Sequence, residues 1–118
     1  MIDLNRILAD QKKLQQYFNY PIDSEDEAVK VSLLREYMLG MSDEVHEALH
    51  EFSWKKWSND LFINNEQMLS ELVDVFMFLS NVMLVLDADE DAFMKKYERK
   101  KAVNIDRALS GYSQTKLK

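Results

Sequence analysis

Two carboxylates stand close together inside the most apolar stretch of the sequence. The segment MLSELVDVFMFLSNVMLVL, residues 68–86, carries Glu71 and Asp74 among leucine, valine, phenylalanine and methionine. On a helix, residues three apart project from nearly the same face, so these two side chains point together. Burying two unpaired like charges costs several kcal/mol or raises their pKa values. The pair therefore requires a compensating group, either a basic side chain or a bound cation.

A second carboxylate pair with the same spacing lies upstream. The tetrapeptide EVHE places Glu44 and Glu47 on one face of another helical segment. If the two helices pack antiparallel, four carboxylates converge, and four anions are tolerable together only around cations. Hard oxygen ligands of this kind suit Mg²⁺ or Mn²⁺. The alternative is ion pairing within the fold, for which the candidate cations are Lys30, Arg35, Lys55 and Lys56.

Two histidines near the upstream pair raise a different metal chemistry. Glu47 followed by His50 matches half of the Glu-x-x-His pattern of di-iron carboxylate bundles, which require a second such motif on another helix. The only other histidine of the chain is His46. We therefore rank a redox di-metal site below a magnesium site, and we expect both histidines to have a surface role.

The composition indicates that helices position these residues. The chain has 118 residues, two glycines, one proline and 31% charged residues, which is typical of one soluble, all-α domain spanning residues 1–118. It has no cysteine, which excludes a disulfide scaffold and fits a reducing cytoplasm. The N-terminal residues contain no apolar signal core. The sequence therefore predicts a cytoplasmic protein.

The first half of the chain predicts two helices. Apolar residues at helical spacing indicate a helix from Ile2 to about Phe18, closed by a proline. Ser24 followed three residues later by glutamate reads as a capping box, opening a second helix that runs to about Trp54. Gly40 lies inside this second helix and is a candidate kink. The segment WSNDLFINNE then interrupts the periodicity and has room for a short helical turn.

The second half of the chain predicts two more helices. One begins near Glu66 and ends by Leu86, and Asp87 or Asp89 can cap the start of the next. That last helix ends at Gly111, in the position typical of a C′ glycine, and the tail from about residue 113 is expected to fray. We therefore expect an all-α bundle of four to five helices.

Charge and hydropathy limit the partners. Residues 68–86 are about as long as a bilayer span, but two carboxylates with Ser70, Ser80 and Asn81 raise the cost of insertion. We expect instead the central helix of a bundle, and no membrane contact. A net charge of −6 argues against binding to a nucleic-acid polymer. It does not exclude a nucleotide, because a carboxylate-bound divalent metal presents positive charge to phosphates.

The ordered set of motifs resembles a known family. Glu44-x-x-Glu47 and Glu71-x-x-Asp74 are similar to the metal-binding signature of the all-α nucleoside triphosphate pyrophosphatases, which include dimeric dUTPases, phage dCTPases and MazG-like enzymes. The segments SWKKWS and YERKKAVNIDRALSGY resemble motifs of the dUTPase and dCTPase branch, and Gln11 stands where that branch often has glutamine. The closing motif is matched by Tyr97, Lys100, Asn104, Arg107, Gly111 and Tyr112, whereas Lys101 and Ala108 depart from it.

The resemblance implies a reaction and a cofactor. The family hydrolyses a deoxynucleoside triphosphate to the monophosphate and pyrophosphate with Mg²⁺, for which Mn²⁺ is a possible substitute. Glu47, Glu71 and Asp74 would then be the main ligands of two or more ions in the catalytic site. Glu44 would be a further ligand or would orient the attacking water as a base. The resemblance implies a homodimer or homotetramer, and a chain of this size often gains stability by associating.

Further residues are candidates for substrate contacts. Phosphate donors on this reading are Lys55, Lys56, Lys100, Asn104, Arg107 and Tyr112. Base contacts would come from Gln11, Trp54 and Trp57, through amide hydrogen bonds and indole stacking. Each has a structural alternative: a solvated basic patch for the last helix, core packing for a tryptophan, and simple exposure for Gln11.

The sequence thus favours a dNTP pyrophosphohydrolase acting on dUTP or dCTP, in nucleotide-pool sanitising or phage nucleotide metabolism. One alternative is a MazG-like enzyme for dGTP or for a modified, non-canonical nucleotide. The alternative of another class is a non-catalytic helical interaction module, in which the acidic residues are solvated or paired.

Overall fold

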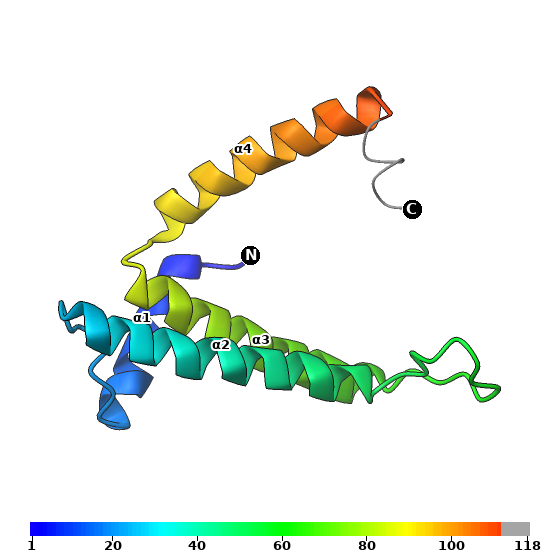
Figure 1. The fold of residues 1–118 in the computed structure, drawn as a ribbon, viewed down its shortest axis with the longest axis horizontal. Helices are drawn as coiled ribbons and strands as arrows, with labels where there is room; N and C mark the ends of the chain where they lie inside the picture. Colours follow the sequence, from blue (N-terminus) through cyan, green and yellow to red (C-terminus); the bar gives the residue numbers. More distant parts are fainter. Residues whose placement is uncertain (112–118) are drawn as a thin grey trace. The chain divides into compact units, whose positions relative to one another are not determined.

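The computed structural model describes residues 1–111, and within them the chain forms α-helices and no strand (Figure 1). The all-α fold class is therefore confirmed. Tyr112 and the tail expected to fray lie outside the described residues. In chain order the helices are α1 (Leu4–Tyr17), α2 (Glu27–Leu49), α3 (Asn65–Val85) and α4 (Glu90–Leu109).

The chain divides into two compact units. The first, Met1–Asp87, contains α1, α2 and α3, and the second, Ala88–Lys118, contains α4. Our expectation of a single domain over residues 1–118 stays a prediction.

Aspartates cap three of the four helices within residues 1–111. The Asp3 and Asp89 side chains accept hydrogen bonds from backbone N–H groups in the first turns of α1 and α4. Asp26 does the same for α2, accepting from the Ala28 N–H at 2.9 Å. The predicted capping box at Ser24 was therefore wrong, because Ser24 Oγ instead accepts from the Asp26 N–H and the helix begins later. Aspartate caps as well as serine, so the residue nearer the helix takes the role.

α2 ends at Leu49 rather than near Trp54. After His50 the backbone leaves the helix, because Phe52 forms an isolated antiparallel bridge with Ile63. The Asn64 N–H also donates to the Glu51 carbonyl at 2.8 Å. These long-range bonds replace helical ones, and the connection between α2 and α3 contains no further helix.

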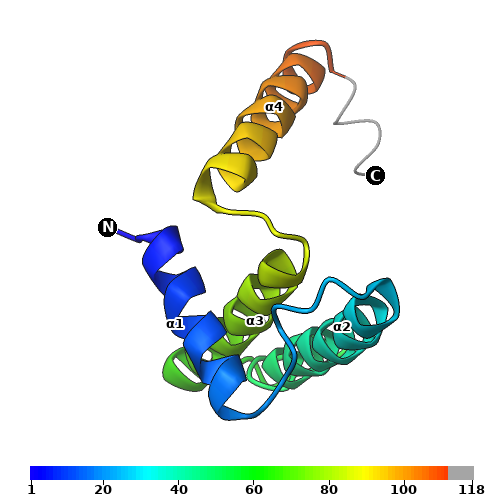
Figure 2. The same ribbon diagram turned by 90° about the vertical axis from the view of Figure 1, so that its left-hand side faces the viewer.

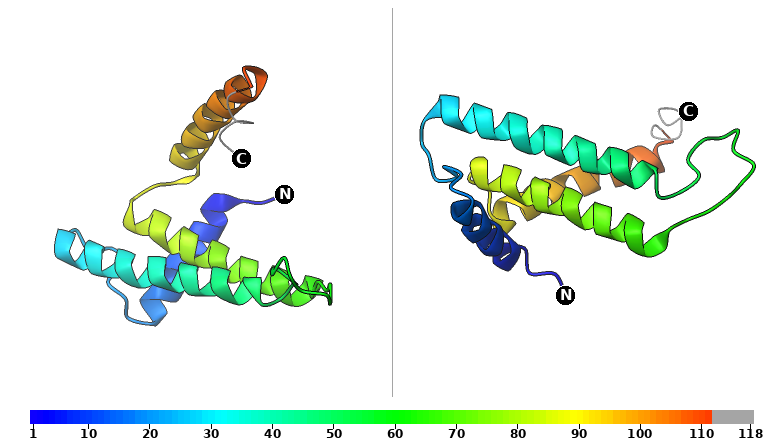
Figure 3. Two further views of the ribbon diagram at one scale, coloured as in Figure 1. Left: turned by 45° about the vertical axis from the view of Figure 1, so that its right-hand side comes forward. Right: turned by 90° about the horizontal axis from the view of Figure 1, so that it is seen from below.

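α2 and α3 lie side by side and run antiparallel, and α1 packs against α3 (Figures 2 and 3). The buried cluster between α2 and α3 consists of Leu33, Tyr37, Val82 and Val85, together with Ile22 from the connection before α2. This core lies toward the start of α2 and the end of α3. The opposite end of the pair, where the carboxylates stand, is therefore more open.

The apolar surface of α3 is only partly covered. Its buried residues all lie in the C-terminal part, from Ser80 to Val85, whereas Leu69 is 63% exposed and Val73 50% exposed. α3 is long and apolar enough to cross a membrane by length and composition alone, a test that the core helix of a soluble protein also passes. Our expectation of a fully buried central helix is thus met only for its C-terminal part within this chain.

The start and end of α4 follow the sequence prediction. Asp89, one of the two candidate caps, accepts from the Ala92 N–H at 2.9 Å. At the other end Gly111 has a φ of +79°, the left-handed conformation that glycine adopts without strain. The predicted C′ glycine is confirmed.

Candidate metal centre

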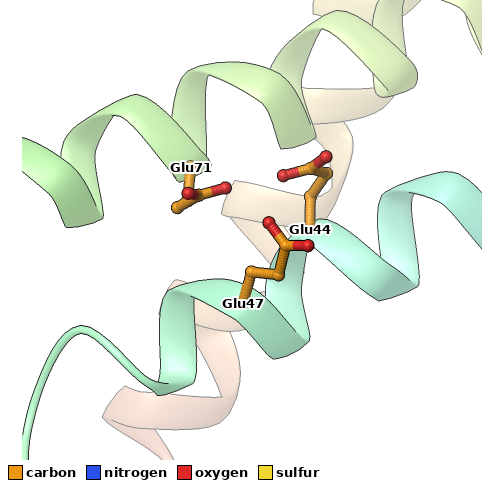
Figure 4. A group of neighbouring side chains, drawn as sticks. All are labelled: Glu44, Glu47 and Glu71. Atoms are coloured by element: carbon orange, nitrogen blue, oxygen red, sulfur yellow. The ribbon is translucent and has the colours of Figure 1, made fainter.

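Three glutamates converge where α2 and α3 run side by side (Figure 4). One carboxylate oxygen each from Glu44, Glu47 and Glu71 lies within 4.8 Å of the other two. α2 supplies two of these side chains and α3 the third, and the antiparallel packing on which the predicted convergence depended is present (Figure 3). Three anionic oxygens this close repel one another unless a proton or a cation lies among them.

The electrostatics of the cluster show this repulsion. A hydrogen bond to Glu71, followed by desolvation and the charges of Glu47, Asp74 and Glu71, raises the pKa of Glu44 to about 7. The charge of Glu71 is the largest cause that raises the pKa of Glu47 above its ordinary value. The pKa of Glu71 is held below its usual range, chiefly by the hydrogen bond from Glu44. Without a cation, the cluster therefore retains a proton near neutral pH.

A hard divalent cation compensates the three carboxylates better than a basic side chain does. Glu44 Oε2 is buried and has no hydrogen-bond partner, and an orphaned buried carboxylate oxygen is costly. Among residues 1–111, Lys30 pairs with Glu25 at 3.9 Å, and no ion pair joins a lysine or arginine to the three clustered glutamates. An oxygen-ligated ion such as Mg²⁺ would satisfy all three carboxylates together.

Asp74 lies one turn beyond Glu71 on α3, outside the three-glutamate group. Its charge contributes to the raised pKa values of Glu44 and Glu47, so it is near enough to act on the cluster. Asp74 and Glu44 also line the same open cleft, which has a volume of about 790 Å³. Asp74 thus stands between the carboxylate cluster and this cleft.

The cleft is formed by one stripe from each helix of the first unit. α1 contributes Gln11 and Gln15, α2 contributes Tyr37 and Glu44, and α3 contributes the stripe from Asp74 to Asn81. Gln11 is only 5% exposed, which excludes the interpretation that it is simply a solvent-facing residue. The structure therefore brings a predicted base-binding residue and two predicted metal ligands to one cleft.

Further polar residues that were not predicted from the sequence line this cleft, among them Gln15, Tyr37 and Asn81. The Tyr37 hydroxyl donates to Gln15 Oε1 at 2.7 Å, and burial raises the pKa of Tyr37 to about 12. Asn81 is 4% exposed, and its Oδ1 has no hydrogen-bond partner. Helical spacing could have found two of them, because Gln15 follows Gln11 by one turn and Asn81 follows Asp74 by about two.

Gly40 has a packing role within the same cleft. α2 continues through this residue, and a Cβ atom there would lie 2.6 Å from the Cε1 and Cζ atoms of Phe78. Only glycine allows the Phe78 ring to lie this close to the α2 backbone. The ring in turn stands between Asp74 and Asn81 on the cleft-facing stripe of α3.

The tryptophan and lysine segment does not reach this cleft in the single chain. The rings of Trp54 and Trp57 meet edge to face at 6.5 Å between centroids, and Lys55 Nζ lies 5.8 Å from the Trp54 ring centroid. The two indoles are 43% and 74% exposed, so neither is packed in the core. Lys56 is likewise exposed. None of these residues lines the cleft that holds Gln11.

On α4, the predicted phosphate contacts form one stripe. Lys100, Asn104 and Arg107 line a groove of about 360 Å³ together with Lys96, Arg99 and Val103. Five of these six side chains can donate hydrogen bonds, and four are cationic. The remaining predicted contact, Tyr112, lies outside the described residues.

The two histidines lie on the exposed side of α2. Their rings stand 4.8 Å apart between centroids, and their Nε2 atoms are 3.3 Å apart. Neither belongs to the group of converging carboxylates within residues 1–111.

The first unit is thus an all-α structure with a carboxylate cluster beside a polar cleft. The family model described as dUTPase matches residues 3–105 of the chain. The chain therefore belongs to the dUTPase family, the all-α group of dUTPase-like and dCTPase-like nucleotide pyrophosphatases. No curated protein and no solved structure matches it.

Proposed function

We propose that this chain is a Mg²⁺-dependent pyrophosphohydrolase that converts dUTP, dCTP or both to the monophosphate and pyrophosphate. The observation that carries the proposal is the convergence of Glu44, Glu47 and Glu71 within 4.8 Å, with no basic partner among the described residues. Membership of the dUTPase family supports it at the level of a nucleotide hydrolase.

In this proposal, Glu47, Glu71 and Asp74 hold the metal, which comprises two or more ions. The bound ions would supply neutralisation of phosphate charge, the main obstacle to attack by water. Glu44 either adds a ligand or orients the attacking water. The two roles separate experimentally, because Glu44→Gln weakens Mg²⁺ binding in the first case and lowers turnover at unchanged Mg²⁺ affinity in the second.

The substrate would lie along the cleft, with its phosphates at the carboxylates and its base extending away from them. Gln11 lines this cleft and offers an amide that can both donate to and accept from a base edge. The proposed phosphate contacts are Lys55, Lys56, Lys100, Asn104, Arg107 and Tyr112, and Trp54 and Trp57 are the proposed stacking residues. We keep a MazG-like preference for dGTP or a modified nucleotide as the alternative substrate class.

The exposed apolar side chains of α2 and α3 support self-association. Leu39 is 71% exposed, Leu69 63% and Val73 50% in the single chain, and apolar residues in such numbers commonly mark an interface. We propose a homodimer or homotetramer acting in the cytoplasm. A partner subunit could also bring Trp54 or Trp57 to a neighbouring cleft.

The decisive experiment incubates the purified protein with each dNTP and NTP in the presence of Mg²⁺. Phosphorus NMR then identifies the products. The proposal expects monophosphate and pyrophosphate from dUTP or dCTP, and no turnover in EDTA. Release of inorganic phosphate instead, or turnover that is indifferent to metal, would contradict it. Absence of any turnover or Mg²⁺ binding would favour a non-catalytic interaction module.

A further inference from the structure

Asn81 combines burial, an unpaired polar atom and a place in the cleft wall. It is 4% exposed, its Oδ1 has no hydrogen-bond partner, and its neighbours on α3 are the buried Ser80 and Val82. A polar group this deeply buried normally has a partner, since an unsatisfied one costs about 1–3 kcal/mol. Ser80 follows that rule by donating to the Phe76 carbonyl at 2.9 Å. Asn81 therefore has a buried side-chain carbonyl oxygen that the fold does not use.

The distance from Asn81 to the carboxylates matches the length of a nucleotide. Asp74 and Asn81 both line the cleft, and they lie about 10 Å apart along α3 at a rise of about 1.5 Å per residue. An extended nucleotide spans a similar distance from its α-phosphate to the far edge of a pyrimidine. A phosphate near Asp74 would thus put the base beside Asn81.

The groups that face Asn81 across the cleft are also amides. Gln11 and Gln15 from α1 are 5% and 6% exposed and line the same cleft. The Oε1 atom of Gln15 is already engaged by the Tyr37 hydroxyl at 2.7 Å, which fixes the orientation of that amide. The cleft therefore presents buried neutral donors and acceptors from α1 and α3, with Asp74 and Glu44 further along it and the exposed Glu36 beside Tyr37.

We infer that Asn81 is a specificity-determining residue, whose side-chain amide reads the hydrogen-bonding edge of a pyrimidine base. The inference rests on the proposed function and adds to it the residue that recognises the base. Oδ1 can accept from uracil N3–H while Nδ2 donates to a ring carbonyl. With the amide turned over, the same group accepts from the cytosine amino group and donates to N3.

This recognition accounts for a preference that can include both dUTP and dCTP. Adenine and guanine carry the same donor and acceptor pairs as cytosine and uracil, so it is the size of the base that the position of Asn81 selects. A purine, with its longer reach from the phosphate, does not fit its edge to an amide about 10 Å from Asp74 along α3 and leaves that buried amide unpaired, which costs more than a loss of apolar contact would. The unpaired Oδ1 destabilises the free protein, and a hydrogen bond from the bound base removes this penalty.

The test measures binding rather than turnover. Calorimetry with Mg²⁺ and the α,β-imido analogues of dUTP, dCTP, dATP and dGTP compares the wild type with Asn81→Leu, which keeps the shape and removes the amide. We expect the variant to lose at least tenfold in affinity for the pyrimidine analogues, with purine affinity little changed. Its melting temperature should stay level or rise, because a buried unsatisfied group has been removed.

The matched control is Met83→Leu. Met83 is 5% exposed and close to Asn81 on α3, but it does not line the cleft. This variant should keep the wild-type preference among the four analogues, which shows that a change in the core near Asn81 does not by itself alter base selectivity.

Three results would overturn the inference. The first is an unchanged ratio of pyrimidine to purine affinity in Asn81→Leu, and the second is an equal loss of affinity for all four analogues. The third is unfolding of the variant, which would show that the Asn81 amide is needed for the stability of the fold. If the wild type binds the analogues but hydrolyses no dNTP, the proposed function fails while the binding ratios still decide the role of Asn81. If the wild type binds no analogue, both fail.

Discussion

Replacing Gly40 by alanine tests how closely α2 and α3 pack beside the candidate site. The added Cβ would lie 2.6 Å from the Phe78 Cε1 and Cζ atoms and 3.2 Å from Cδ1. The two contacts at 2.6 Å are shorter than real Cβ contacts and the third is tight, so the Phe78 ring must move. That ring lines the cleft and packs on the core cluster that contains Tyr37, so its movement affects both stability and the cleft.

Two opposing effects set the magnitude. Overpacking a core costs about 1–3 kcal/mol, whereas replacing a mid-helix glycine by alanine gains about 1 kcal/mol. We therefore expect Gly40→Ala to lower the free energy of unfolding by roughly 0–2 kcal/mol, despite the better helix propensity. Because the displaced ring stands between Asp74 and Asn81, nucleotide binding should weaken more than stability does.

Urea unfolding and calorimetric titration with a nucleotide analogue measure the two effects. The informative control is the double variant Gly40→Ala with Phe78→Leu, in which the shorter side chain makes room for the new Cβ. Its unfolding free energy should exceed the value expected from adding the two single changes. If Gly40→Ala instead raises the free energy of unfolding by about 1 kcal/mol, as at an ordinary mid-helix glycine, and binds nucleotide like the wild type, the close contact between α2 and Phe78 is wrong.

Two further predictions concern the polar groups of the first unit. The pKa of Glu44 is raised from 4.5 to about 7, so between these pH values the folded, metal-free protein holds a proton that the unfolded chain has released. Its melting temperature should therefore fall as the pH rises through this window. Both Glu44→Gln and saturating Mg²⁺ should make the melting temperature depend less on pH. A melting temperature that rises through the same window would contradict the cluster. Tyr37→Phe removes the 2.7 Å bond to Gln15 Oε1 and should destabilise the protein by about 1–3 kcal/mol in urea unfolding, whereas Tyr20→Phe, at a 39% exposed side chain, should change it little.

Local sequence rules located the helices but misplaced both ends of α2. Apolar periodicity found all the helices of residues 1–111, and turn chemistry found the Asp89 cap and the Gly111 end. The errors at Ser24 and Trp54 arose where another contact decided the boundary. Asp26 stood nearer the helix start, and the bridge between Phe52 and Ile63 drew the chain out of α2.

Side-chain spacing predicted which carboxylates share a face, but not the environment of the other residues. The two motifs on α2 and α3 predicted that four carboxylates converge if the helices pack antiparallel; the helices do so, and Glu44, Glu47 and Glu71 form the group, whereas Asp74 lies outside it. The burial of Gln11 and the unpaired Asn81 depend on how α1 crosses α3, which no local pattern encodes. The contacts of Trp54 and Trp57 with a nucleotide stay a prediction for the same reason.

The central claim is that the carboxylate cluster holds the metal that hydrolysis needs. The most direct measurement is the Mg²⁺ dependence of pyrophosphate release from dUTP and dCTP by the wild type, Glu47→Gln and Asp74→Asn, with Glu66→Gln as an exposed control on α3. The account predicts that both cluster variants stay folded, bind Mg²⁺ more weakly and lose at least a hundredfold in rate, a typical effect of losing a metal-site group. The control should match the wild type. Wild-type rates and Mg²⁺ dependence in Glu47→Gln and Asp74→Asn would contradict it.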